Sequence, residues 1–102
     1  MTTNTDIKDQ TLVIQLKDGS QVAFKQLFDR YTPRIYRFAI SYLKSDADAE
    51  ELVQDVFLKL WEKRETLDES QNIRAYIFKI AINSIYNLSK KKNYKQVYNE
   101  FV

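Results

Sequence analysis

The sequence predicts an all-α fold, a compact bundle of about four helices with no sheet. The chain has 102 residues but only one glycine and one proline, Gly19 and Pro33. A β-rich domain needs many turns, and glycine and proline are the residues that usually build them. Apolar residues instead recur every three or four positions, as they do on one face of a helix. The length suits one domain with a single modest hydrophobic core.

Two helices are expected in the first half of the chain. The segment DQTLVIQLKDG has Asp9 as its N-cap and Gly19 as its C-terminal stop. A second helix begins after Ser20, a residue type that caps helix N-termini. Its apolar stripe keeps its phase across Pro33, so we expect one kinked helix here in preference to two helices.

Two more helices are expected in the second half. The stretch SDADAEELVQDVFLKLWEKRE opens with Ser45 and Asp48 at the spacing of a capping box, and acids crowd its first turn, where the helix dipole favours them. The loop RETLDESQN then leads to a helix with Asn72 as N-cap that runs to Lys92. Residues 93–102 are weakly amphipathic and could form a tail, a docking helix or the start of a linker.

The core is expected to draw on the last three of these helices. Apolar pairs recur one turn apart in the third helix, and the fourth carries a broad apolar side. That apolar side consists of Ile77, Phe78, Ala81, Ile82, Ile85 and Leu88. The side chains expected to meet in one core are Phe28, Leu52, Phe57, Trp61, Ile77, Ala81 and Ile85.

Composition excludes several kinds of chemistry. Cysteine and histidine are both absent, which removes thiol chemistry, disulfides, the commonest general base and the usual transition-metal ligand. No apolar run approaches the roughly 20 residues of a membrane span, and the polar start MTTNTDIKDQ is no signal peptide. We therefore expect a cytoplasmic protein without membrane contact that is not an enzyme and has no catalytic residue, metal site or cofactor.

Charge is distributed unevenly along the chain. Residues 1–71 carry ten Lys or Arg and thirteen Asp or Glu, whereas residues 72–102 carry six Lys or Arg and a single acid, Glu100. This asymmetry predicts two surfaces with different partners, the basic one a candidate for nucleic acid. The alternative is that Lys90, Lys91 and Lys92 only favour the negative end of a helix dipole.

Polar side chains form one face on the third helix and another on the fourth. The face on the third helix, called the acidic face below, consists of Glu51, Gln54, Asp55, Leu58 and Glu62. A solvated surface is the simplest account of it, although an apolar residue among charges, Leu58, counts against that account. The face on the fourth helix, called the polar arc below, spans roughly 100° and consists of Tyr76, Lys79, Asn83, Tyr86, Asn87 and Lys90.

The polar arc combines three side-chain types that suit nucleic acid. Lysine neutralises phosphate, asparagine can read a base edge, and an aromatic ring can stack on an unpaired base. The arc contains no acid, whereas an ordinary solvated face would more often mix Glu among the lysines. An ordinary amphipathic helix with a polar outer face remains the alternative.

Two stretches carry a family resemblance. DAEELVQDVFLKLWEK, followed by a short polar loop and NIRAYIFKIAINSIYN, resembles region two of extracytoplasmic-function (ECF) sigma factors, bacterial proteins that direct RNA polymerase to promoters. The resemblance includes GSQVAFKQLFDRYTPRIYRFAISYL and covers about Lys17 to Lys92. Its most specific parts are Asp48 to Trp61 and the KIAIN run that ends at Asn83. It implies a helical bundle of the sigma region two type.

The resemblance implies a partner for each face. In such proteins the helix like DAEELVQDVFLKLW docks on the clamp helices of the polymerase beta-prime subunit, which implicates the acidic face. The last helix reads and melts the promoter minus-ten element as single-stranded DNA, and the preceding loop holds a flipped-out base. The loop residues are Asp68, Glu69, Ser70, Gln71 and Asn72; the helix residues are those of the polar arc, and Lys90, Lys91 and Lys92 would bind phosphates. The family also implies an anti-sigma factor as a partner.

The chain departs from the family pattern in two ways. The dense aromatic run that housekeeping members use for melting is reduced here to Tyr76 and Tyr86. Family members also carry a second helical domain, region four, that reads the minus-thirty-five element, whereas ten residues follow Lys92. We expect residues 1–92 to be the region two domain, with about eight disordered residues at its start. Residues 93–102 would be a tail or the start of a linker to an absent region four.

Two other classes of function remain open. A stand-alone helical regulator would bind DNA or RNA without any contact with polymerase. A pure interaction module, such as a decoy for an anti-sigma factor, would keep its partner even without the charge of the three lysines.

Overall fold

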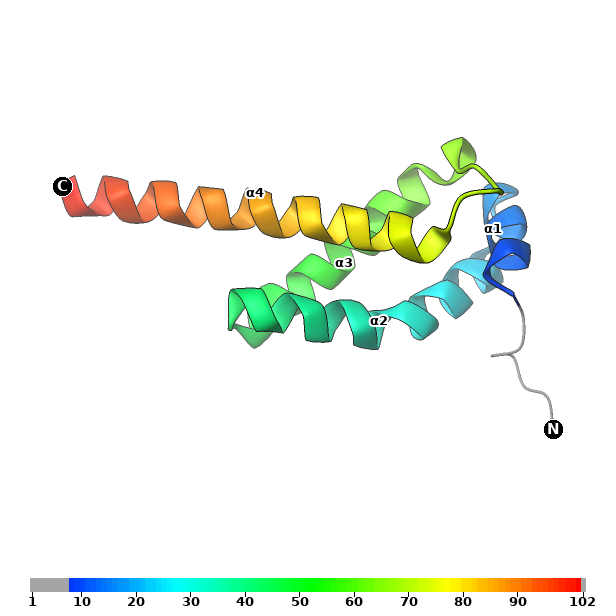
Figure 1. Cartoon of the computed structure of the whole chain (residues 1–102), viewed down its shortest axis with the longest axis horizontal. Helices are drawn as coiled ribbons and strands as arrows, with labels where there is room; N and C mark the ends of the chain where they lie inside the picture. The colour runs from blue at the N-terminus through cyan, green and yellow to red at the C-terminus, as the bar shows by residue number, and fades with distance from the viewer. Residues whose placement is uncertain (1–7, 102) are drawn as a thin grey trace.

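Four α-helices and one 3₁₀ turn make up the part of the chain that the structure describes (Figure 1). The structure, a computed structural model, describes residues 8–101, without the side chains of residues 89 and 91–101. The elements in order are α1 (Asp9–Lys17), α2 (Gln21–Leu43), α3 (Asp46–Glu62), the turn η2 (Arg64–Thr66) and α4 (Ile73–Phe101). Residues 8–101 contain no strand, and the all-α prediction is confirmed. The expected disorder at the start of the chain falls on residues 1–7, which lie outside the described residues.

The helix ends follow local capping chemistry. The predicted N-caps Ser20, Ser45 and Asn72 each accept a hydrogen bond from the amide three residues later, at 3.0, 3.2 and 3.2 Å. Gly19 ends α1 as predicted: its φ of 91° is a left-handed conformation, and its amide donates to the carbonyl of Leu16 at 2.8 Å. These boundaries are specified by residues within one turn of the helix end.

The start of α1 differs from the prediction. The N-cap is Lys8, which makes no side-chain capping bond, and Asp9 is the first residue inside the helix. The Asp9 carboxylate instead accepts hydrogen bonds from the Arg30 guanidinium and the Tyr31 hydroxyl of α2. Asp9 therefore joins two helices, a tertiary role that the local pattern does not reveal.

Pro33 lies inside α2, which is one helix of 23 residues, as predicted. Figure 1 shows this helix changing direction part-way along its length. Proline has no N–H to donate, and its ring crowds the carbonyl four residues earlier, so a bend is the usual result. On the two sides of the core, α2 packs against α3 and α4.

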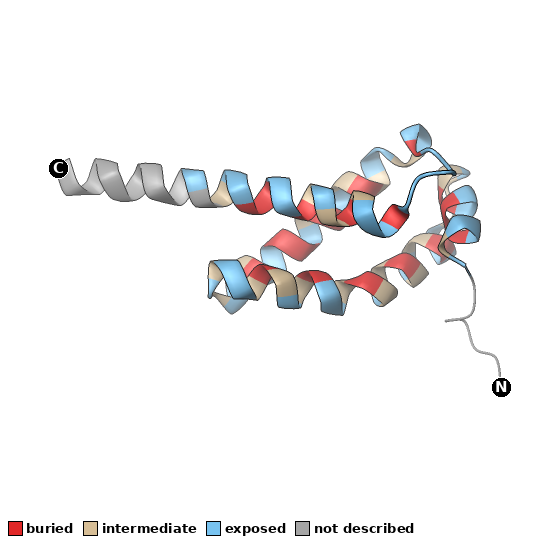
Figure 2. Cartoon of the chain, in the orientation of Figure 1, coloured by how far each residue is buried: buried red, intermediate tan, exposed pale blue. Residues whose placement is uncertain are grey.

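The core lies where α2, α3 and α4 meet, and α1 closes one end of it (Figure 2). Phe57 of α3 is its largest fully buried side chain, and its ring packs edge-on against Phe24 and Phe28 with centroids 6.3 and 4.9 Å apart. Five of the seven predicted core residues are buried; the other two, Phe28 and Trp61, are only partly buried and pack against the core. Trp61 sits at the rim with the Arg64 guanidinium 4.1 Å above its ring.

The apolar side of α4 is narrower than predicted. Ile82 was placed on it by helical spacing, yet 52% of Ile82 is exposed. Only the part of α4 that α2 and α3 cover is buried, and Ile82 lies just outside that part. α4 also continues as helix to Phe101, across the expected division between residues 92 and 93. That division of the chain stays a prediction.

Among residues 8–101, no helix combines the length and the apolar character that a membrane span requires.

Candidate functional site

Four residues of the acidic face surround one hollow between α3 and α4. Glu51, Gln54, Asp55 and Leu58 line it together with Leu52, Ser84 and Leu88. The structure therefore brings most of the acidic face together around a partly apolar surface. Glu62, the last residue of α3, is exposed but does not line the hollow.

A polar contact beside this hollow connects α3 to α4. The Asp55 carboxylate lies 3.1 Å from the Lys59 ammonium one turn further along α3. Ser84 of α4 is buried, and its hydroxyl lies 3.4 Å from Lys59 Nζ and 3.5 Å from Asp55 Oδ2. These two hydrogen bonds are long and therefore weak. They nevertheless satisfy a buried hydroxyl and hold the Asp55 carboxylate at the α3–α4 contact.

Leu58 stands between two hollows. It belongs to the hollow described above and to a second one that it shares with Gln21, Phe24 and Trp61. Leu58 is 55% exposed, and exposed apolar side chains beside apolar hollows are typical of surfaces that receive a partner. The sequence argument that Leu58 is unusual for a solvated face agrees with this position.

The polar arc is exposed along most of its length. Lys79, Asn83, Asn87 and Lys90 are exposed, and Tyr86 is 65% exposed. The exception is Tyr76, which is partly buried and packs against the core. Tyr86 is therefore the more exposed of the two predicted rings. The predicted contacts of Lys91 and Lys92 lie outside the described side chains.

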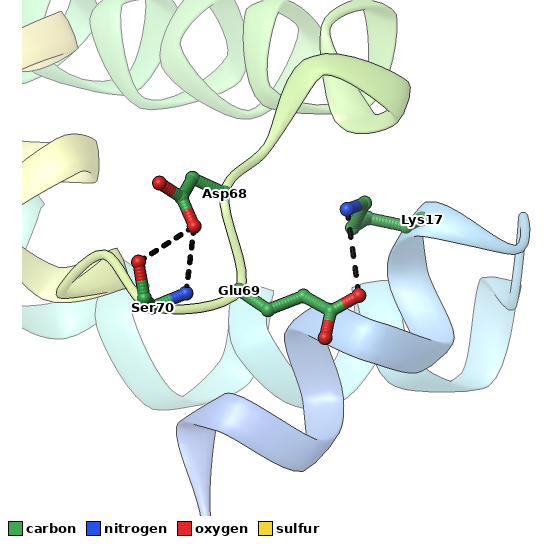
Figure 3. A network of polar contacts seen from close by, with 4 residues as sticks. All are labelled: Lys17, Asp68, Glu69 and Ser70. Carbon is green, nitrogen blue, oxygen red and sulfur yellow. Dashed lines mark hydrogen bonds and ion pairs between the residues drawn. The ribbon is translucent and has the colours of Figure 1, made fainter.

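The loop before α4 is held by its own side chains and by α1 (Figure 3). Asp68 Oδ1 accepts hydrogen bonds from the Ser70 hydroxyl at 2.7 Å and the Ser70 amide at 2.9 Å. These bonds stabilise the charged carboxylate and lower the pKa of Asp68 below its usual value. The Glu69 carboxylate lies 3.5 Å from the Lys17 ammonium at the end of α1.

The same loop borders a hollow that α1 helps to form. Glu69, Ser70, Gln71, Asn72 and Ile73 line it from the loop and the start of α4, and Asp9 and Gln10 line it from α1. The structure thus brings most of the loop predicted to hold a flipped base around one concave surface. Asn72 also caps α4, so its side-chain oxygen is already engaged at the rim of this surface.

Sequence reasoning missed two residues at these surfaces. Lys17 is 52 positions from Glu69, and Ser84 is 29 positions from Asp55. Neither pair falls in one helix, so no periodicity could have joined them. Within the described part of the chain, no group of three or more His, Cys, Asp or Glu side chains could hold a metal ion.

The chain is similar to known sigma factors over most of its length. The family model for sigma-70 region 2 matches residues 27–94. The RNA polymerase sigma factor CnrH of Cupriavidus metallidurans is 29% identical over 93 residues, which cover 91% of this chain and 49% of CnrH. The ECF RNA polymerase sigma factor SigW of Bacillus subtilis is 29% identical over 79 residues, which cover 76% of this chain and 42% of SigW. The chain therefore spans about half the length of these relatives.

Two solved structures share the fold. An engineered region 2 of sigmaE, solved in complex with GTAAAA, matches with a TM-score of 0.81 over 92% of this chain and 97% of that chain, at 24% identity. CnrH, solved in complex with the cytosolic domain of CnrY, matches with a TM-score of 0.74 over 78% of this chain and 51% of that chain, at 30% identity. The acidic face of α3 and the basic α4 that follows it are in keeping with these matches. The chain belongs to the sigma-70 region 2 family, in its extracytoplasmic-function group.

Proposed function

We propose that this domain binds core RNA polymerase through the acidic face and recognises and melts the promoter minus-ten element through the polar arc and residues 68–72. The single observation that supports this best is the separation of charge between neighbouring helices. The exposed face of α3 carries carboxylates around an exposed leucine, whereas α4 has no acid from Ile73 to Asn99. One domain thus offers a surface for a protein and a surface for a polyanion.

The acidic face suits a protein partner of mixed apolar and basic character. Leu58 and the hollow beside it provide apolar contact, and Glu51 and Asp55 can pair with basic side chains at the rim. Such an arrangement follows the general anatomy of protein interfaces, in which a desolvated centre is surrounded by polar groups. In the sigma factor family the corresponding partner is the pair of clamp helices in the beta-prime subunit.

The polar arc and the loop suit melted DNA. Opening base pairs costs a few kcal/mol, which stacking on a ring and a pocket for the extruded base can offset. Tyr86 is the exposed ring, Asn83 and Asn87 are the amides, and Lys79 and Lys90 are the cations. The Asp68–Ser70 hydrogen bond and the weak Glu69–Lys17 ion pair restrain the loop, which would reduce the conformational entropy lost when a base enters. The engineered sigmaE region 2 that shares this fold was solved in complex with GTAAAA, which supports the proposal at the level of the fold.

This role requires binding and strand separation without covalent chemistry. The proposed protein is therefore cytoplasmic and not an enzyme. Regulation by a second protein is part of the proposal. CnrH is bound by the cytosolic domain of CnrY in its solved structure, and we expect an anti-sigma factor to bind this domain as well.

The decisive experiment combines polymerase binding with sequence selection. The chain is mixed with core polymerase, and the complex is challenged with forked DNA that carries six randomised unpaired positions on the non-template strand. We expect co-purification with core enzyme and enrichment of one motif. Failure to bind core enzyme together with tight binding of duplex DNA would favour a stand-alone regulator. Binding to core enzyme without any enriched motif would favour a pure interaction module.

Two substitutions then separate base reading from phosphate contact. Asn83→Ala removes a candidate base-edge contact and should reduce the preference for the enriched motif by about 1–3 kcal/mol, with an unchanged salt dependence. Replacing Lys90, Lys91 and Lys92 with alanine should weaken binding to every sequence alike and flatten the salt dependence. Equal loss of matched and scrambled DNA in Asn83→Ala would show that Asn83 is not a reader.

A further inference from the structure

Two matched rows of side chains line the seam between α2 and α4. The α2 row is Arg34, Phe38 and Tyr42, and the α4 row is Arg74, Phe78 and Ile82, each with a spacing of four residues. Residues four apart share one face of a helix. The rings of Phe38 and Phe78 meet edge-on with centroids 5.5 Å apart, so the middle members of the rows touch. Since α2 and α4 run in the same direction (Figure 1), the two arginines occupy corresponding positions.

Much of this seam is open to solvent. Arg34 and Arg74 are exposed, Tyr42 is 64% exposed, and the Tyr42 ring packs against Phe38 with centroids 5.2 Å apart. Beside Phe78 is a hollow lined by Asn72, Arg74, Ala75 and Phe78. The seam therefore ends at the last residue of the loop proposed to hold a flipped base. Exposed apolar groups gathered in one place mark a binding surface.

The charge of the seam has one sign. No Asp or Glu occurs between Arg30 and Lys44, or from Asn72 to Asn99. Within the described residues, no ion pair joins Arg34, Arg37 or Arg74 to a carboxylate. The Arg34 guanidinium lies 5.8 Å from the centroid of the Tyr31 ring, a contact that does not neutralise its charge. An unneutralised basic seam with exposed rings is complementary to a polyanion that has free π-faces.

We propose that this seam is a second binding surface for single-stranded DNA, next to the minus-ten element. Arg34 and Arg74 neutralise phosphates of the flanking nucleotides, and Tyr42 stacks on one of their bases. This inference rests on the proposed function, because the polar arc and the loop deliver the strand to the seam. Phosphate contacts and stacking are tolerant of sequence. The seam therefore adds affinity for melted DNA without adding base preference.

The test compares two oligonucleotides and two double variants. One oligonucleotide is the six-nucleotide motif enriched by the holoenzyme, and the other extends it by four nucleotides on each side. Binding to the chain is followed by fluorescence anisotropy over a series of salt concentrations. Arg34→Gln with Arg74→Gln should lower the slope of log affinity against log salt by about 1.4 for the longer strand, at about 0.7 per phosphate contact. The shorter strand should bind this variant as it binds the parent.

A charge-matched control removes two lysines elsewhere. Lys25→Gln with Lys63→Gln changes the net charge equally at two exposed positions outside the seam, and should leave the difference between the two strands unchanged. Tyr42→Ala should lower affinity for the longer strand by roughly five- to a hundredfold, the effect of losing one stacked base. Far-UV circular dichroism should be the same for all variants, since the substituted side chains are exposed.

The outcomes separate this inference from the function it rests on. If the parent does not bind the six-nucleotide strand, the proposed DNA role of the domain is wrong. If it binds both strands equally, or if Arg34→Gln with Arg74→Gln loses no more affinity than the lysine control, the seam is not a DNA surface and the proposed function stands. Displacement of the longer strand by an equal concentration of poly-glutamate would overturn the assignment and indicate an acidic protein as occupant.

Discussion

Reversing the charge of Asp55 should separate polymerase docking from fold stability. The Asp55 carboxylate forms an exposed ion pair with Lys59 one helical turn away, at 3.1 Å. Such a pair stabilises a helix by about 0.3–0.5 kcal/mol, and two like charges at the same spacing cost a similar amount. Asp55→Lys removes the first and creates the second. The substitution also removes the weak hydrogen bond from the buried Ser84 hydroxyl, and it replaces the repulsion between Glu51 and Asp55 with an attraction. These two further changes oppose each other, so the free energy of unfolding should fall by no more than about 1 kcal/mol.

The effect on docking should be larger. Asp55 lines the hollow beside Leu58, so a partner that covers this face meets the reversed charge directly. Like charges brought together in an interface cost several kcal/mol. A loss of about 2 kcal/mol already corresponds to roughly thirtyfold weaker binding. The ratio between the two effects is what identifies a docking residue.

Asp29 provides a matched control. It forms an exposed ion pair with Lys25 at 2.8 Å, also at a spacing of four residues, but on α2. Asp29→Lys therefore makes the same change of charge and breaks an ion pair of the same spacing, away from the acidic face and from Ser84. Urea unfolding measures stability, and titration of labelled protein with core polymerase measures docking. If Asp55→Lys binds core enzyme as tightly as Asp29→Lys does, the docking face has been assigned wrongly.

Three further predictions concern the core, the α1–α2 contact and the loop. Phe57→Ala should cost about 3–5 kcal/mol of unfolding free energy, and Trp61→Ala should cost less because Trp61 is only partly buried; equal costs in urea unfolding would contradict this packing. Burial, together with the hydrogen bond to the Asp9 carboxylate, raises the pKa of Tyr31 to about 12. The folded state thus keeps the proton longer than the unfolded one, so stability should fall between about pH 10 and 12, and Tyr31→Phe should remove that loss. A double-mutant cycle of Lys17→Gln and Glu69→Gln should give a coupling below about 1 kcal/mol that disappears at high salt, and a coupling that salt does not change would contradict a solvent-exposed ion pair.

The helices and most of their caps could be predicted because their signals are local. Ser20, Ser45 and Asn72 each act on an amide three residues away, so the capping bond is contained in the sequence pattern. The single helix across Pro33 followed from the unbroken phase of the apolar stripe. The acidic face could be outlined for the same reason, because its five members share one face of one helix; four of them line the same hollow.

The remaining features depend on contacts between elements. Asp9 has the residue type of an N-cap, but the Arg30 and Tyr31 side chains of α2 hold its carboxylate, and the helix begins one residue earlier. Tyr76 was expected to be exposed but packs against the core, and Ile82 was expected to be buried but faces solvent. Helical spacing gives the direction of a side chain around the helix axis. It does not give the width of the helix surface that neighbouring helices cover. The aligned rows of the α2–α4 seam could not be predicted either, because their alignment depends on how the two helices pack.

The acidic face also contains a local conflict that stability alone would not favour. Glu51 and Asp55 are both acidic and lie four residues apart on α3, a spacing at which like charges destabilise a helix by about 0.2–0.5 kcal/mol. The ion pair with Lys59 offsets part of this cost. Both carboxylates line the same hollow, where they would repel nucleic acid from the surface proposed for polymerase and attract basic side chains to it. Glu51→Gln should therefore raise the free energy of unfolding by a few tenths of a kcal/mol while weakening binding to core polymerase. Thermal unfolding at low salt and a polymerase titration of the same variant measure the two effects. A variant that becomes more stable and also binds core polymerase more tightly would show that the Glu51 carboxylate contributes to neither stability nor docking.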